Sequence, residues 1–220
     1  MKKHKWIWIL LLTLVVLAGC KKKEVSKKEI PLYETDFSTD DGHWTTGNLG
    51  TAGASAAVSN GYYVLKGGSG GREVWTGKIF SGTTGGAALE ASVKLSTNGG
   101  ANDGAGGLIW GLKKKDDNDL YTSFYFEISY DGYYTVWGYP NGSEKPYVIY
   151  RDWVLNGVIR ENELNKLRIT LVNNELRFYI NDRELFAMPS PGNSTLDQPG
   201  FKIRKYSTMQ VDYFKALQLP

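Results

Sequence analysis

The distribution of strand-forming residues constrains the fold of this chain more than any other feature. From Pro31 onward, short runs rich in Val, Ile, Tyr, Phe and Trp alternate with clusters of Gly, Asn, Asp and Ser. Such runs predict β-strands separated by turns. The predicted strands are 32–37, 62–66, 73–80, 87–95, 107–113, 121–129, 133–139, 148–151, 166–172, 175–180, 183–187, 200–204 and 209–217. About a dozen short strands predict one all-β domain, an antiparallel two-sheet sandwich or a barrel.

The chain offers little support for other architectures. No stretch shows sustained helical periodicity, and the nearest candidate, residues 154–164, contains Gly157 and lacks a clear cap. No repeat of fixed period is present, which argues against a propeller or a solenoid. Glycines cluster between the predicted strands, so we interpret these clusters as loops of a single domain.

The strongest hairpin signal lies at Asp131-Gly132, between two aromatic-rich runs. A two-residue turn at these positions places Phe126 opposite Trp137. A three-residue turn, with Gly132 as the left-handed residue, places Phe126 opposite Val136 instead. The two registers put different aromatic side chains on each face of the hairpin.

We prefer the three-residue turn because it separates aliphatic from polar side chains, as a half-buried antiparallel pair requires. The apolar face is then Phe124, Phe126, Ile128, Tyr134 and Val136. The opposite face is Tyr125, Glu127, Ser129, Tyr133, Thr135, Trp137 and Tyr139. Aromatic rings among polar groups suit the stacking of sugar rings, and ordinary cross-strand packing is the alternative. A second hairpin, 166–187, reads as purely structural sheet with asparagine-rich turns.

The first twenty residues indicate export. A basic start precedes an apolar run over 6–18, which is shorter than the roughly 20 residues that span a bilayer and has the length of a signal-peptide core. The run ends in Leu17-Ala18-Gly19-Cys20, which resembles the bacterial lipobox. The resemblance implies cleavage before Cys20 and lipidation of its thiol. The alternative is an uncleaved membrane anchor with an incidental cysteine.

These features divide the chain into a lipoprotein signal peptide (1–19), a lysine-rich tether (20–30) and a β-sandwich domain (31–220). Two or more acyl chains would hold the protein firmly in membrane lipid. Lys21 follows the cysteine where an acidic retention residue would stand. We therefore expect the outer membrane in a cell with two membranes, and otherwise the outer face of the plasma membrane.

Charge and cysteine content exclude some functions. The chain has 26 basic and 23 acidic residues, but three lysines belong to the signal peptide and five to the tether. The domain itself is therefore net negative, and no nucleic-acid partner is expected. Cys20 is the only cysteine, so the domain cannot contain an intramolecular disulfide.

Several segments together resemble the concanavalin A-like, laminin G-like superfamily of jelly-roll domains. They are GGLIWGLKKKDDNDLYTSFYFEISYDGYYTVW, NKLRITLVNNELRFYINDREL, the closing MQVDYFKAL and the opening YETDFSTDDGHW. The resemblance implies two face-packed antiparallel sheets with ligand on the concave face or at the loop edge. The carbohydrate-binding candidates are Tyr125, Glu127, Tyr133, Trp137, Tyr139 and Trp110, and Trp110 can face either way. Binding modules, adhesion domains, lyases and hydrolases share this fold.

Structural calcium is a further implication of this resemblance. Domains of the superfamily often hold one ion near the chain ends through acidic and carbonyl oxygens. Asp36 and Asp212 are the candidate ligands, together with Asp40 and Asp41, because the first and last strands should be neighbours. Turn formation by these aspartates is the alternative, and the cluster 116–119 is a second candidate.

Catalytic signatures are weak. Retaining glucanases of this fold carry carboxylates in an E-x-D-x-E pattern on one strand, which sets them about 5–5.5 Å apart, and this chain has no such run. His43 is the only histidine after the signal peptide, so a nucleophile–base triad or a histidine zinc site is poorly supported. The sequence favours a glycan-binding module. The alternatives are a hydrolase or lyase, with Glu90 facing Glu127, and an adhesive lipoprotein whose partner is a protein.

Overall fold

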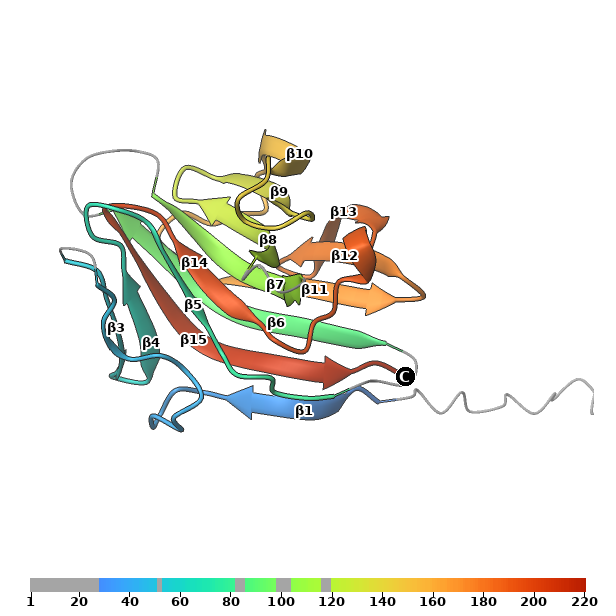
Figure 1. The fold of residues 1–220 in the computed structure, drawn as a ribbon. Helices are drawn as coiled ribbons and strands as arrows, with labels where there is room; N and C mark the ends of the chain where they lie inside the picture. The colour runs from blue at the N-terminus through green and yellow to red at the C-terminus, as the bar shows by residue number, and fades with distance from the viewer. Residues whose placement is uncertain (1–27, 51–52, 82–85, 98–103, 116–119) are drawn as a thin grey trace, which may run out of the picture.

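A computed structural model describes residues 28–50, 53–81, 86–97, 104–115 and 120–220 (Figure 1). The signal peptide, Cys20, most of the tether and the acidic cluster 116–119 lie outside the described residues. Within them the chain forms strands, turns and one short 3-10 helix, η2 (Pro191–Asn193). No described helix is long and apolar enough to cross a membrane.

The strands form two antiparallel sheets. The nine-stranded sheet has the order β13 (Arg183–Pro189), β12 (Glu175–Ile180), β11 (Asn165–Val172), β6 (Ala87–Thr97), β15 (Ser207–Gln218), β4 (Tyr62–Lys66), β3 (Ser55–Ser59) and β2 (Gly47–Asn48), with β1 (Ile30–Thr35) also paired to β15. The six-stranded sheet has the order β10 (Val148–Leu155), β9 (Tyr133–Tyr139), β8 (Leu120–Ser129), β7 (Ala105–Lys115), β14 (Gly200–Ile203) and β5 (Arg72–Trp75). The predicted two-sheet sandwich is confirmed.

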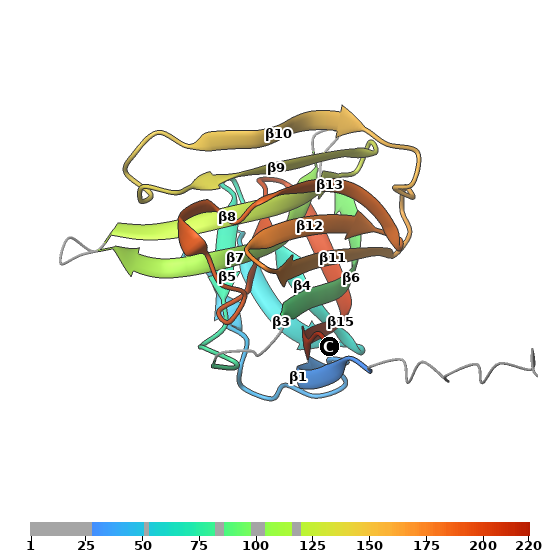
Figure 2. The same ribbon diagram turned by 90° about the vertical axis from the view of Figure 1, so that its right-hand side faces the viewer.

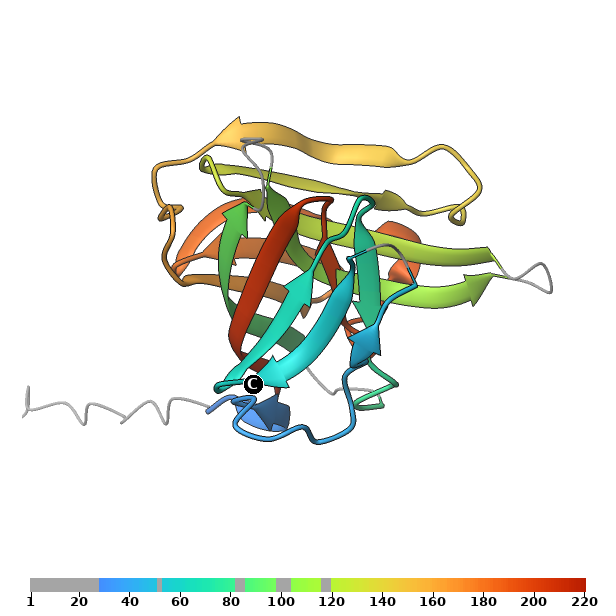
Figure 3. The same cartoon turned by 90° about the vertical axis from the view of Figure 1, so that its left-hand side faces the viewer.

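The order of the strands shows the jelly-roll connectivity. Strands β5 and β14, far apart in the sequence, lie side by side in the six-stranded sheet, and β1 runs along β15 next to the C-terminus (Figure 1). Strands β9 and β10 extend beyond β8 along one side of the sandwich (Figure 2). On the other side, β3 and β4 follow β15 (Figure 3).

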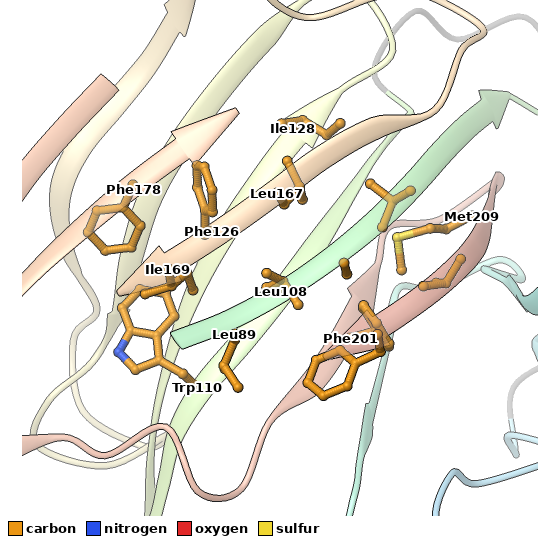
Figure 4. Close-up of a cluster of buried hydrophobic side chains, with 14 of the residues drawn as sticks. Leu89, Leu108, Trp110, Phe126, Ile128, Leu167, Ile169, Phe178, Phe201 and Met209 are labelled. Atoms are coloured by element: carbon orange, nitrogen blue, oxygen red, sulfur yellow. The ribbon is translucent and has the colours of Figure 1, made fainter. Parts of the chain in front are cut away.

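A continuous apolar core lies between the sheets (Figure 4). Phe126 and Phe201 of the six-stranded sheet, and Leu89, Ile169 and Phe178 of the nine-stranded sheet, are all completely buried. Each such side chain contributes about 1.5–3 kcal/mol of hydrophobic burial. The alternation of apolar and polar residues along strands such as β12 directs one face of the strand inward.

The turns follow the sequence signals. Gly132 has φ +89°, and its N–H donates to the Ser129 carbonyl at 3.2 Å. Phe126 lies opposite Val136 and Ile128 opposite Tyr134, so the preferred three-residue register is confirmed. The asparagine-rich turns of the second hairpin also have positive φ, at Asn173, Asn174, Asn181 and Asp182.

The predicted strands differ most from the observed ones in three places. Strands β2 and β3 were missed because Gly47-Asn48 and the sequence SAAVS contain almost none of the residues that mark strands. β5 ends at Trp75, whereas residues up to Phe80 were predicted. Thr76 and Ile79 instead donate their N–H groups to the carbonyls of Pro199 and Asp197. β10 continues four residues beyond its predicted end.

Candidate functional site

The outer face of the six-stranded sheet carries a groove, which we call the β9 groove. It consists of two adjoining hollows of about 340 and 270 Å³ that share Trp153 and Arg204. The first is lined by Thr135, Trp137, Tyr139, Tyr147, Ile149, Asp152, Trp153 and Arg204. The second is lined by Ala105, Ser129, Asp131, Tyr133, Trp153 and Arg204. Both linings contain aromatic rings and polar groups.

Strand alternation explains which side chains of β8 and β9 lie on this outer face. Phe126 and Val136 point into the core, so their neighbours Tyr125, Glu127 and Trp137 point outward. Tyr125 lies opposite Trp137 in the register of the two strands. The predicted polar, aromatic face is therefore present, and the structure adds the partners that cover part of it.

Glu127 is a completely buried carboxylate on this outer face. Its Oε2 atom accepts hydrogen bonds from Arg204 Nη2 at 2.8 Å and from Trp137 Nε1 at 2.9 Å. A buried charge without partners is costly, so both donors stabilise the buried Glu127 carboxylate. Glu127 thereby connects β8, β9 and the residue that follows β14.

Trp137 and Tyr125 form a closed pair rather than an open platform. Their rings stack with centroids 4.2 Å apart and an interplanar angle of 23°. Lys202 Nζ lies 4.5 Å from the Tyr125 centroid and is ion-paired with Glu73 at 2.6 Å. Tyr125 is consequently buried, and burial, reinforced by the Glu73 charge, raises the pKa of its hydroxyl. Only part of Trp137 is open to a ligand.

β10 and the residue before it add two further rings to the groove, Trp153 and Tyr147. Tyr147 is 58% exposed and contacts Trp137 edge-on, with ring centroids 5.7 Å apart. Trp153 lies under Arg204, whose guanidinium carbon is 5.0 Å from a Trp153 ring centroid. Register shifts on both sides of Arg151 bend the strand, and Asp152 and Trp153 line the groove.

Sequence reasoning missed these β10 residues and Arg204. The predicted strand ended at 151, and bulges leave no simple alternation to read. Arg204 is 77 positions from Glu127, so only the pairing of β14 with β7 brings them together. The one available signal was the aromatic content of the segment 147–153.

The interpretation of Trp110 as a binding residue was wrong. Trp110 lies opposite Phe124 in the pairing of β7 with β8, so it shares the inward parity of Phe124. Its ring is completely buried and stacks on Phe124 at 5.6 Å, with Phe178 of the other sheet 5.3 Å away. Trp110 Nε1 is the buried side-chain polar atom without a hydrogen-bond partner in the part of the chain that the structure describes.

Calcium stays an untested prediction. β1 and β15 are neighbours, as expected. Asp36 accepts the N–H of Ser38 and Asp40 that of Gly42, both at 3.0 Å, which is turn formation. Asp41 accepts from the Tyr33 hydroxyl at 2.6 Å. Among the described residues, no three His, Cys, Asp or Glu side chains gather in a way that could hold a metal, and Asp212 belongs to no such group.

The arrangement that would have favoured a hydrolase is not formed. Glu90 lies on β6 and accepts from Arg168 Nη1 and from the Tyr213 hydroxyl, each at 2.9 Å. Because β6 and β8 belong to different sheets and both carboxylates point outward, Glu90 and Glu127 lie on opposite faces of the sandwich. β8 contains one carboxylate, Glu127.

A larger hollow, about 960 Å³, lies on the outer face of the nine-stranded sheet. Its charged side chains already pair with one another: Lys166 with Asp182, Arg168 with Glu29 and Glu90, and Arg177 with Glu175. These ion pairs leave few free groups for a ligand. The β9 groove, which combines aromatic rings with polar groups, is the better candidate site.

The two antiparallel sheets, their jelly-roll order and the groove on one outer face define a concanavalin A-like jelly-roll sandwich. No protein-family model matches the chain, and no curated protein matches its sequence.

Solved structures share the fold at low identity. A Bacillus licheniformis beta-glucanase superposes with a TM-score of 0.60 at 10% identity, covering 86% of this chain and 98% of that one. The metal-free carbohydrate recognition domain of Emp46p gives 0.59 at 16% identity, with 86% and 97% covered. The catalytic domain of an endo-1,3-beta-glucanase (laminarinase) from Thermotoga petrophila RKU-1 gives 0.55 at 14%, with 87% and 98% covered.

Proposed function

We propose that this chain is an exported lipoprotein whose jelly-roll domain binds glycans in the β9 groove. The observation that carries the proposal is the lining of the groove. Tyr147, Trp153 and Tyr133 present ring surface, and Asp131, Asp152 and Arg204 present hydrogen-bonding groups beside it. Ligand sites generally combine an apolar lining with a few placed polar groups. Pyranose rings, with apolar faces and hydroxyl rims, match this combination.

The structural neighbours support the same class of ligand. They include a carbohydrate recognition domain and glucanases, all with this fold. Because the sequence identity to each neighbour is low, the structural similarity establishes the fold alone. The proposed glycan-binding function therefore rests on the lining of the groove. A groove lined by several aromatic rings also favours glycan over a flat adhesive contact with a protein.

Binding is preferred to hydrolysis because of the state of Glu127. Retaining hydrolysis requires two carboxyl groups about 5–5.5 Å apart, one of them a nucleophile open to the sugar. Glu127 is completely buried and held by Arg204 and Trp137, and β8 offers no second carboxylate. Its role is to position the two side chains that bond to it.

Titration calorimetry tests the proposal. The full chain, solubilised in a sugar-free polyoxyethylene detergent, is titrated with a panel of soluble polysaccharides. We expect Trp153→Ala and Tyr147→Ala each to weaken the detected binding about tenfold or more, because truncating a central aromatic contact typically costs over 1 kcal/mol. Tyr179→Ala, on the outer face of the other sheet, is the matched control.

Two results would contradict the proposal. One is the absence of binding to every polysaccharide in the panel. The other is binding that survives both groove substitutions at full affinity. Circular dichroism of each variant separates loss of the site from loss of the fold, and little loss of fold is expected because Tyr147 is largely exposed.

A further inference from the structure

We propose, on the basis of the glycan-binding function above, that the β9 groove selects uncharged glycans and excludes polyanionic ones such as uronate-rich chains. The proposal rests on the charges of the groove and on how each is held. It concerns the class of ligand, which the fold alone leaves open.

Three charged side chains line the groove: Arg204, Asp131 and Asp152. The positive charge of Arg204 is offset by Glu127, which lies directly behind it at 2.8 Å. The remaining two charges are both negative. A glycan in the groove therefore meets a net negative lining, which repels carboxylate and sulfate groups.

Arg204 already has an anionic partner in Glu127. Its Nε and Nη2 atoms both donate to Glu127, at 3.5 and 2.8 Å, and its guanidinium lies over Trp153. Glu127 is completely buried, so withdrawal of Arg204 would leave an unpaired buried carboxylate, which is strongly unfavourable. A ligand carboxylate would have to compete with that partner. The remaining guanidinium N–H groups can donate to sugar hydroxyls while the ion pair stays closed, and because Glu127 already offsets the Arg204 charge they give a ligand carboxylate little net electrostatic attraction.

The two aspartates are placed to accept hydrogen bonds from hydroxyls. Asp131 Oδ1 accepts from Ser129 Oγ at 2.5 Å, and Asp152 Oδ1 accepts the N–H of Trp153 at 2.8 Å. Both side chains are exposed, and each bond fixes a carboxylate at one wall of the groove. An ionised carboxylate has about four lone-pair sites and no donor. It therefore binds sugar hydroxyls and disfavours other carboxylates.

Two neighbouring cations are engaged by other side chains. Lys202 is the next cation along β14, and its Nζ atom is ion-paired with Glu73 at 2.6 Å while lying over the Tyr125 ring. Arg151 of β10 extends instead toward Phe186, 5.9 Å from the ring centroid. Lys202 and Arg151 thus have contacts of their own.

Matched neutral and anionic probes test the proposal. The detergent-solubilised full chain is titrated with laminarin, barley β-glucan and xylan, each in native and carboxymethylated form, and with polygalacturonate. We expect the native polymers that bind to do so at least tenfold more tightly than their carboxymethylated forms. In Asp131→Asn/Asp152→Asn that ratio should fall at least threefold, because the repulsion is removed.

A charge-matched control variant is Glu161→Gln/Glu163→Gln, which removes two acidic charges outside the groove lining and should keep the wild-type ratio. Equal or tighter binding of an anionic form, lost in Trp153→Ala, would overturn the inference and leave glycan binding standing. An unchanged ratio in the double Asp variant would also overturn it. Absence of binding to all probes would instead remove the proposed function itself.

Discussion

The hydrogen-bond partners of each carboxylate in this protein decide whether its side chain is held in place or stays exposed. Glu127 and Glu90 both lie on outward-facing positions, yet each is held by an arginine and one further donor. Asp131 and Asp152 keep one local hydrogen bond and stay exposed. The first two therefore act as fixed structural charges, and the last two can contact a ligand.

At Asp197 the effect of such partners on a carboxylate can be measured through the pH dependence of stability. Burial raises its pKa, but hydrogen bonds from Thr195 and Lys78, with the Lys78 charge 2.9 Å away, outweigh burial and hold the pKa below its usual value. A lowered pKa in the folded state stabilises the fold above the unfolded pKa of about 3.9, and this contribution is lost as pH falls through the folded value.

We therefore expect Asp197→Asn to lower the free energy of unfolding by about 1 kcal/mol at pH 7. The difference from wild type should shrink as pH is lowered from about 5 toward 3, since the wild-type carboxylate then becomes protonated. Urea denaturation at several pH values measures both effects. A difference that is independent of pH would show that Asp197 acts through packing rather than charge.

At the level of elements, the β8–β9 hairpin decides the site because its register selects which side chains face outward. A shift by one residue would exchange Trp137 with Val136 and bring an aliphatic face to the groove. Gly132 fixes the register through its left-handed conformation, φ +89°. The β10 bulges then bring Trp153 over the same face.

Gly132→Ala tests how strongly the turn specifies the register. An alanine in the left-handed region costs about 1–2 kcal/mol, and its Cβ would meet only Leu155 Cδ1 at 3.5 Å, so strain rather than a clash is the expected cause. The variant should lose that much stability in urea denaturation. Gly157→Ala, with ordinary φ and open space around the Cβ, is the control and should change stability little. Equal effects of the two substitutions would refute this role for Gly132.

At the scale of the whole molecule, the two outer faces differ. The six-stranded sheet carries the groove, and the nine-stranded sheet carries paired charges. The start of the described chain lies against the latter, where Glu29 pairs with Arg168 at 2.5 Å. The proposed binding face and the face met by the N-terminal segment are thus on opposite sides of the sandwich.

If Cys20 anchors the protein, its substitution should abolish membrane attachment and leave the folding of the domain unchanged. Cys20→Ala should abolish incorporation of labelled palmitate and move the protein from the membrane fraction, because the lipid-bearing thiol is lost. The thermal unfolding of the domain should stay unchanged, since residue 20 precedes the first strand at Ile30. Palmitate labelling and membrane fractionation measure this, and lipid labelling that persists in the variant would rule out Cys20 as the acceptor.

The sequence by itself determined the local structure of this protein. Alternation of side chains, turn residues tolerant of positive φ and the position of Gly132 are local steric effects, so most strands, the turns and the outward face of the β8–β9 hairpin could be predicted. Tertiary structure alone decided which outward residues stay accessible. Tyr125 is buried by its partners, Trp110 turns inward, and Arg204 meets Glu127 across 77 positions. Such outcomes depend on how distant strands pack, and local sequence does not encode that packing.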